Sequence, residues 1–250
     1  MNDAVENASA RRLLVLGAIA PLLALSFYLA ETLVIVAAPA PYPVALGDWL
    51  SLFQTNRILA LIYLNAPDIL SIPLLGLMFL ALRRAVGENH RTAATIASAS
   101  AFLGIAVFVS IRSALLAIMS LSDRYAAAAT DGAQRAVETA GLAIDALGNP
   151  TPQTAGFFFI AIAAAVFSVI MLRRGGFLRI TGLVGLAAAV ATIADDVSLV
   201  VAPGVSGVLM GVAGACWVVW WIFTSVALFR LARQRTAADF AAGITPKEDA

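Results

Sequence analysis

The chain has 250 residues, of which 61% are hydrophobic and only 12% are charged. A soluble domain has about 45–50% apolar and about 25% charged residues, so this chain has too few charges to cover a water-exposed surface. Its net charge of +1 gives no basic field for a phosphate backbone, which argues against a nucleic-acid partner. One cysteine and one histidine exclude a disulfide framework and metal sites built from clusters of these residues. The composition predicts a polytopic membrane protein with the lipid bilayer as its partner and with no cofactor or metal.

Six apolar segments are long enough to cross about 30 Å of hydrocarbon as helices of roughly 20 residues. They are residues 13–38, 58–82, 94–119, 155–172, 180–202 and 206–231. Backbone groups in hydrocarbon must bond within their own segment. We therefore expect an all-α bundle of six transmembrane helices forming one domain, residues 1–235, followed by a polar cytoplasmic tail, residues 236–250.

The first segment invites a second interpretation, as a cleaved export signal. Arg11 and Arg12 resemble a twin-arginine motif, and residues 38–40 resemble a small-residue cleavage site. The apolar stretch of about 26 residues is longer than the roughly 7–15 residues of a signal peptide. We therefore expect an uncleaved first span.

Positive charges give the orientation, because cytoplasmic loops of membrane proteins are enriched in lysine and arginine. If six spans alternate, twelve cationic residues lie on one side, whereas Arg57, Arg124 and Arg135 lie on the other. The twelve are Arg11, Arg12, Arg83, Arg84, Arg91, Arg173, Arg174, Arg179, Arg230, Arg233, Arg235 and Lys247. This partition predicts that both termini are cytoplasmic.

Two segments on the opposite side have local patterns. Between the third and fourth spans, Ala133, Val137, Ala140, Ile144 and Leu147 form one apolar helical stripe, with Thr130 as its N-cap and 148–150 (GNP) as its stop. We expect a short extracytoplasmic helix that lies on the membrane surface or over the ends of the bundle, with a lid over a cavity as the sharper alternative. We interpret residues 39–55 as a proline-stiffened loop whose Tyr42 and Trp49 suit the membrane interface.

Ionisable groups within the spans are the candidate functional residues, because such groups cost several kcal/mol in lipid and normally face the bundle interior or water. With one neighbouring amide they form an expected intramembrane polar cluster of Glu31, Asn65, Asp68, Arg112, Asp195 and Asp196. One interpretation is an internal salt-bridge network in which Arg112 pairs with Glu31, Asp195 or Asp196, with Glu31 or Asp196 favoured. The other is an outward-facing acidic pocket with Asp68 at its floor, where Pro67 and Pro73 loosen the helix.

The sixth span contains two groups of packing residues, small glycines and bulky tryptophans. Gly204, Gly207, Gly211 and Gly214 form a stripe that permits close helix approach, either within the chain or in a homo-oligomer or larger membrane complex. Gly182 and Gly185 extend this pattern to the fifth span. We expect Trp217, Trp220 and Trp221 to provide core or lipid-facing bulk rather than a ligand cage.

Motifs of enzymes are missing from the sequence: it has no H-E-x-x-H, no G-x-S-x-G and no P-loop. We therefore favour a non-enzymatic membrane module, such as an accessory, sensor or regulatory protein. The alternative is a small-solute or proton/cation-coupled transporter that uses the acidic pocket. A lipid-modifying enzyme remains a third class.

Three segments carry a family resemblance: residues 125–135 (YAAAATDGAQR), residues 171–179 (MLRRGGFLR) and the Trp220–Trp221 pair of the last span. This pattern resembles a family of bacterial six-helix integral membrane proteins known only as a domain of unknown function. The resemblance implies a multi-pass protein of the bacterial cytoplasmic membrane. It implies no activity and no site residues.

Overall fold

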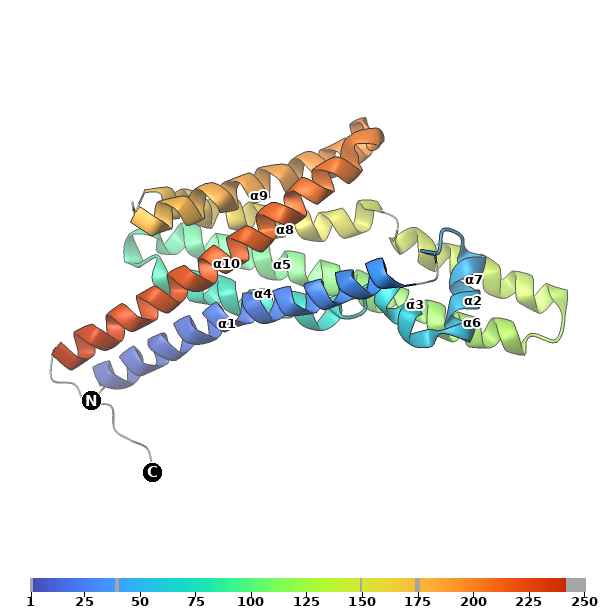
Figure 1. Cartoon of the computed structure of the whole chain (residues 1–250), viewed down its shortest axis with the longest axis horizontal. Helices are drawn as coiled ribbons and strands as arrows, with labels where there is room; N and C mark the ends of the chain where they lie inside the picture. Colours follow the sequence, from blue (N-terminus) through green and yellow to red (C-terminus); the bar gives the residue numbers. More distant parts are fainter. Residues whose placement is uncertain (1, 39–40, 149, 174–175, 242–250) are drawn as a thin grey trace, which may run out of the picture.

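The computed structural model describes residues 2–38, 41–148, 150–173 and 176–241, which are helical and contain no strand (Figure 1). Their helices are α1 (Asn2–Ala37), α2 (Leu46–Thr55), α3 (Arg57–Tyr63), α4 (Asp68–Ala85), α5 (Arg91–Leu115), α6 (Ala117–Ala127), α7 (Asp131–Gly148), α8 (Pro150–Leu172), α9 (Gly176–Val201) and α10 (Pro203–Ala241). A short 3₁₀ helix, Glu88–His90, joins α4 to α5. The last described helix therefore extends past residue 235, and the rest of the expected tail lies outside the described residues, as do Asn149 and Arg174.

Six helical segments of the described chain are long and apolar enough to cross a membrane, which confirms the predicted all-α bundle of six spans. They are residues 8–37, 57–85, 91–127, 155–172, 178–201 and 203–234. Two spans are composite. The second consists of α3 and α4, and the third consists of α5 followed by α6, which carries the helix past the expected end at Met119.

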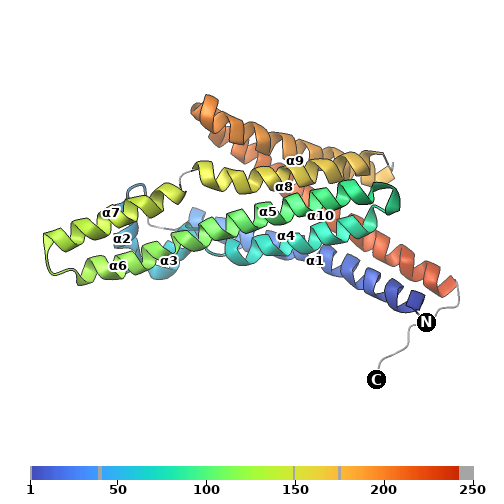
Figure 2. The ribbon, with the colours of Figure 1, turned by 180° about the vertical axis from the view of Figure 1, so that it is seen from behind.

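The spans pack in a ring that follows the order of the sequence. α1 packs on α4, α4 on α5, α5 on α8, α8 on α9 and α9 on α10, and α10 returns to α1. The beginning of α1 and the end of α10 lie at the same end of this ring (Figures 1 and 2). The first and last spans therefore form the seam that closes the bundle.

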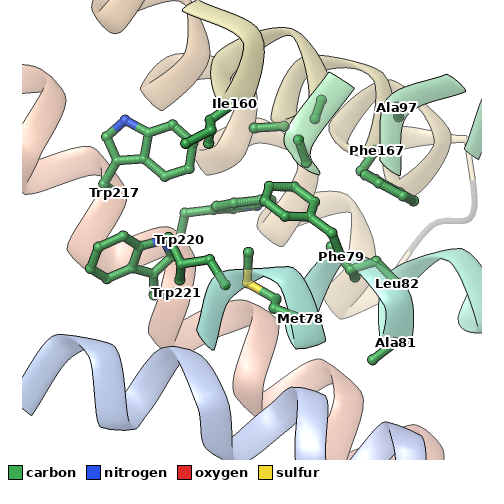
Figure 3. Packing of buried hydrophobic residues seen from close by; sticks show 14 of the residues in the cluster. Met78, Phe79, Ala81, Leu82, Ala97, Ile160, Phe167, Trp217, Trp220 and Trp221 are labelled. Carbon is green, nitrogen blue, oxygen red and sulfur yellow. The ribbon is translucent and has the colours of Figure 1, made fainter. Parts of the chain in front are cut away.

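Aromatic side chains fill the centre of the ring. Trp220 is fully buried, and its ring lies 6.2 Å from that of Phe79, which in turn lies 5.9 Å from that of Phe167 (Figure 3). Trp217 donates a hydrogen bond from its indole nitrogen to the hydroxyl of Thr192 at 2.8 Å. The tryptophans of the sixth span are thus core residues, one of the two roles expected for them.

A second hydrophobic core lies at the end opposite the chain termini. There α6 and α7 project beyond the bundle and α2 packs against them; we call these three helices the helical cap (Figures 1 and 2). Its core contains buried residues of α2, α3 and α6, together with half-buried Val137 and Ile144 of α7. The predicted helix between the third and fourth spans is confirmed, and the hydroxyl of Thr130 accepts a hydrogen bond from the Ala133 amide at 3.3 Å.

Residues 46–55 form helix α2, so the interpretation of residues 39–55 as a loop was wrong for this part. Trp49 is only 6% exposed and lies in the cap core. The carboxylate of Asp48 accepts hydrogen bonds from the amides of Ala45 at 3.0 Å and Val44 at 3.2 Å, which lowers the pKa of Asp48. These bonds satisfy amides at the start of the helix that have no partner inside it.

Close helix contacts in the described chain occur at glycines other than those of the expected stripe. Gly204, Gly207 and Gly211 have no neighbouring atom within 4 Å of an added Cβ. These three glycines therefore do not pack against another described helix, whereas a Cβ at Gly214 would lie 3.7 Å from the Tyr28 hydroxyl oxygen on α1. On α9, by contrast, a Cβ at Gly182 would lie 2.7 Å from the carbonyl oxygen of Ser168 on α8. Helices α5 and α8 approach each other closely at Gly104 and Gly156.

The Gly104→Val substitution should destabilise the bundle. A Cβ at residue 104 would lie 2.5 Å from the carbonyl oxygen of Gly156 and 2.8 Å from Cγ1 of Ile160, so α5 and α8 would have to separate. Overpacking of this kind costs about 1–3 kcal/mol. Gly207→Val is the matched control and should have little effect, because residue 207 has open space around it. Thermal unfolding of the two variants in detergent measures the difference, and equal destabilisation would contradict this packing.

Candidate functional site

The second span is interrupted within the membrane segment, between the end of α3 at Tyr63 and the start of α4 at Asp68. Asn65 has a φ of 53°, in the left-handed region that asparagine tolerates better than most side chains. Pro67 has no amide hydrogen and disfavours a helical conformation in the residue before it. The interruption is closed by its own hydrogen bonds, including Asn65 N–H to Ile62 O at 2.8 Å and Ala66 N–H to Leu61 O at 3.0 Å.

Arg112 extends from α5 to this interruption. Its side chain is nearly buried, and its Nη2 lies 4.0 Å from Oδ2 of Asp68, at the first turn of α4. Its Nη1 donates a hydrogen bond of 3.4 Å to the carbonyl oxygen of Leu64, just after α3 ends. The guanidinium also lies 5.2 Å from the centroid of the Phe108 ring. One cation thus meets a carboxylate, a freed carbonyl and an aromatic face.

Asn65 connects Arg112 to a second carboxylate. The amide orientation that satisfies all its neighbours has its oxygen accepting from Nη2 of Arg112 at 3.1 Å. Its nitrogen then donates to Oε1 of Glu31 at 3.0 Å and to the carbonyl oxygen of Tyr63 at 3.1 Å. Glu31 comes from α1 and is buried. A side chain on the interruption therefore links the first, second and third spans.

The helix ends complement the charges placed beside them. Asp68 begins α4, where the positive end of the helix dipole favours a negative charge, and its Oδ1 accepts a hydrogen bond from the Ser71 hydroxyl at 3.3 Å. Arg112 faces the carbonyl end of α3, where positive charge is favoured. Two carboxylates and one guanidinium give the cluster a formal charge of −1 when all three are ionised. We call Glu31, Asn65, Asp68 and Arg112 the arginine cluster.

The structure separates the six residues of the expected polar cluster into two groups. Asp195 and Asp196 lie near the turn between α9 and α10, which stands apart from α3 (Figure 1). There Oδ1 of Asp195 accepts a hydrogen bond of 2.7 Å from the Ser206 hydroxyl, and Oδ2 of Asp196 is buried without a hydrogen-bond partner in the described chain. Arg112 has a carboxylate partner within the bundle, as predicted, but the favoured partners were wrong: the carboxylate at salt-bridge distance is that of Asp68, not that of Asp196 or Glu31.

Sequence reasoning missed several hydrogen-bond partners of the arginine cluster: the Leu64 carbonyl that binds Arg112, the Tyr63 carbonyl that binds Asn65, and Ser71, which binds Asp68. The carbonyl oxygens of Tyr63 and Leu64 leave no trace in the residue types, because any residue could supply them. Ser71 could have been found, since it follows Asp68 by three residues on the same helix face. Among the described residues, no three histidine, cysteine, aspartate or glutamate side chains are placed to hold a metal ion.

Comparison with known protein families identifies the family of this chain. A family model described as Domain of unknown function (DUF4386) matches residues 12–225. The chain belongs to this family. The match covers the second to fifth membrane helices, most of the first and sixth, the helical cap and the whole arginine cluster of this DUF4386 chain. No curated protein and no solved structure matches it.

The Arg112→Ala substitution should destabilise this DUF4386 protein far more than Arg57→Ala. Removing Arg112 leaves the buried carboxylate of Asp68 without its cation, and breaking a buried pair in this way costs about 3–5 kcal/mol. The Arg57–Asp123 pair at 2.5 Å is about half exposed on both sides, and exposed pairs contribute about 0–1 kcal/mol. Denaturant or thermal unfolding in detergent checks the contrast. Equal losses, or a larger loss for Arg57→Ala, would contradict the proposed importance of the buried pair.

Proposed function

We propose that this DUF4386 chain is a non-enzymatic sensor or regulatory module of a bacterial cytoplasmic membrane. In this proposal the helical cap receives a signal outside the cytoplasm and the arginine cluster transmits it into the bundle. The observation that carries the proposal is the direct junction between the two parts. Tyr63 and Leu64 belong to the buried core of the cap, and their carbonyl oxygens are bound by Asn65 and Arg112.

The junction is stiffened from the cap side by aromatic contacts. The Tyr42 hydroxyl donates to the Tyr63 carbonyl oxygen at 3.3 Å, and the Tyr42 ring lies 5.3 Å from the Tyr63 ring. Tyr42 also makes an edge contact of 5.6 Å with the Trp49 ring of α2. A displacement of α2 would therefore move the Tyr63 carbonyl oxygen, which accepts a hydrogen bond from the same Asn65 nitrogen that donates to Glu31. This geometry supports mechanical coupling between the cap and the first three spans.

The proposed orientation has both termini in the cytoplasm and the cap outside. It is supported by the twelve cationic residues of one side against Arg57, Arg124 and Arg135 of the other. A role without catalysis is supported by the contacts of the two carboxylates within the protein. Glu31 accepts a hydrogen bond from Asn65, and Asp68 contacts Ser71 and Arg112.

We also propose that the module works in a homo-oligomer or larger complex through the glycine stripe. Gly204, Gly207 and Gly211 have open space beside them, and Val208 next to them is 71% exposed. Small residues of this kind allow another transmembrane helix to approach closely. An accessory or regulatory protein needs such a contact with its target.

The interruption itself favours a second candidate, a proton- or cation-coupled transporter. Transporters build ion sites at discontinuous membrane helices, where freed carbonyls and helix ends meet carboxylates. Asn65 and Asp68 stand at such a position. In this alternative they line an acidic pocket open to the outer side.

Hydrogen exchange in lipid nanodiscs distinguishes the two candidates. Asp68→Asn should raise amide exchange in α2 and α6 while leaving α8 and α9 unchanged, because it weakens the junction under the cap. Asp195→Asn is the matched control. It also removes a hydrogen-bonded carboxylate of an outer segment, but the partner of that carboxylate is Ser206. Unchanged exchange in the cap of Asp68→Asn would contradict the sensor proposal.

The same proteins in liposomes that contain a pH-sensitive dye complete the test. If the protein is a sensor or regulatory module, we expect liposomes that contain it to show no more proton flux than protein-free liposomes. Flux that depends on the wild-type protein and disappears in Asp68→Asn would instead establish the transporter.

A further inference from the structure

The seam between the first and last spans contains a groove lined by arginines. Its volume is about 570 Å³, and it lies between the beginning of α1 and the end of α10. Its lining residues are Arg11, Arg12, Val15, Leu16, Phe229, Ala232 and Arg233. None of these is acidic, so the groove has three positive charges and no carboxylate on its described walls. We propose that this groove binds an anionic phospholipid of the leaflet at the chain termini.

The charged residues of the groove lie nearer the end of the bundle than its apolar residues, in the same order as the headgroup and acyl chain of a lipid. Arg11 precedes Val15 by one helical turn, and Arg12 precedes Leu16 by the same interval. On α10 the order is reversed along the sequence, and Arg233 follows Phe229 by one turn. Because the two helices run in opposite directions at the seam, the arginines of both walls lie about 6 Å closer to the end of the bundle than the apolar residues.

This arrangement fits a headgroup above an acyl chain. A guanidinium can bind a phosphate through two parallel hydrogen bonds, and arginines from both helices can hold one phosphate between them. Leu16 is 52% exposed and offers an apolar surface one turn deeper. Basic pockets between membrane helices on the cytoplasmic side are the kind of site that anionic headgroups occupy. A free phosphate would use the arginines but not the apolar wall.

A second, smaller cavity at the same end supports a lipid-facing role for this surface. It has a volume of about 250 Å³ and is lined by Leu13, Leu80, Arg83, Arg84, Gly87 and Arg91. Arginines therefore line cavities on both flanks of α1. A lipid in the seam groove would tie α1 to α10 and thereby close the ring of spans, independently of what the arginine cluster does at the other end.

Lipid titration of the full-length protein tests the proposal. The probe is phosphatidylglycerol added to protein in neutral detergent, with native mass spectrometry counting bound lipids and thermal unfolding reporting stabilisation. Arg12→Gln/Arg233→Gln should weaken phosphatidylglycerol binding about tenfold or more, because each basic side chain at an anionic surface contributes to the attraction. Arg124→Gln/Arg135→Gln removes the same charge from exposed positions of the cap region and should leave binding within about twofold.

Two further arms separate the alternatives. Leu16→Ser should also weaken phosphatidylglycerol binding while retaining every arginine, and it serves as the second variant if the double substitution fails to fold. Inorganic phosphate and phosphatidylcholine should neither bind nor stabilise the protein. Equal stabilisation by inorganic phosphate would overturn the lipid assignment, and equal loss of binding in Arg124→Gln/Arg135→Gln would show a general effect of charge instead of a site.

Discussion

A single arginine within an apolar bundle sets the main constraint on this structure. Moving such a charge into a membrane helix costs about 2.5–3.5 kcal/mol on insertion scales, so Arg112 needs partners within the protein. A continuous second span could offer side chains but no backbone, because its carbonyls would be bonded within the helix. The interruption after Tyr63 frees the Leu64 carbonyl for Arg112 and places Asp68 at a new helix start. The break thus supplies Arg112 with a carbonyl and a carboxylate, although the Nε atom of Arg112 is buried without a hydrogen-bond partner among the described residues.

The consequence of this arrangement is that two separate cores share one junction. The ring of spans is organised around Trp220, Phe79 and Phe167, whereas the cap has its own core around Trp49, Phe53 and Tyr63. Polar bonds instead of apolar packing connect them at Asn65. The proposed regulatory role would act through this hydrogen-bonded junction, because it joins the two cores.

Much of the fold could be predicted from the sequence, because the strongest signals there are long apolar runs and helix caps. The six spans and the helix that begins after Thr130 depend on such local signals. Helix α2 was missed because Pro39, Pro41 and Pro43 suggest a loop, while its buried face becomes meaningful only beside α6 and α7.

The candidate site was less predictable because its partners are brought together by the ring order. The sequence shows which charges lie within spans, but the choice between Asp68 and Asp196 as partner of Arg112 depends on how neighbouring helices pack. The backbone partners are invisible in residue types. The glycine stripe shows the same limit, because small residues permit close approach without stating which helix approaches.

A double-mutant cycle on Arg112→Gln and Asp68→Asn tests the central claim most directly. Unfolding free energies of the wild type, the two single variants and the double variant give the interaction energy of the pair. If the arginine holds the interrupted second span through Asp68, the double variant should be less destabilised than the sum of the singles by about 1 kcal/mol or more. Additivity within about 0.5 kcal/mol would show that the two charges act independently and would contradict this account.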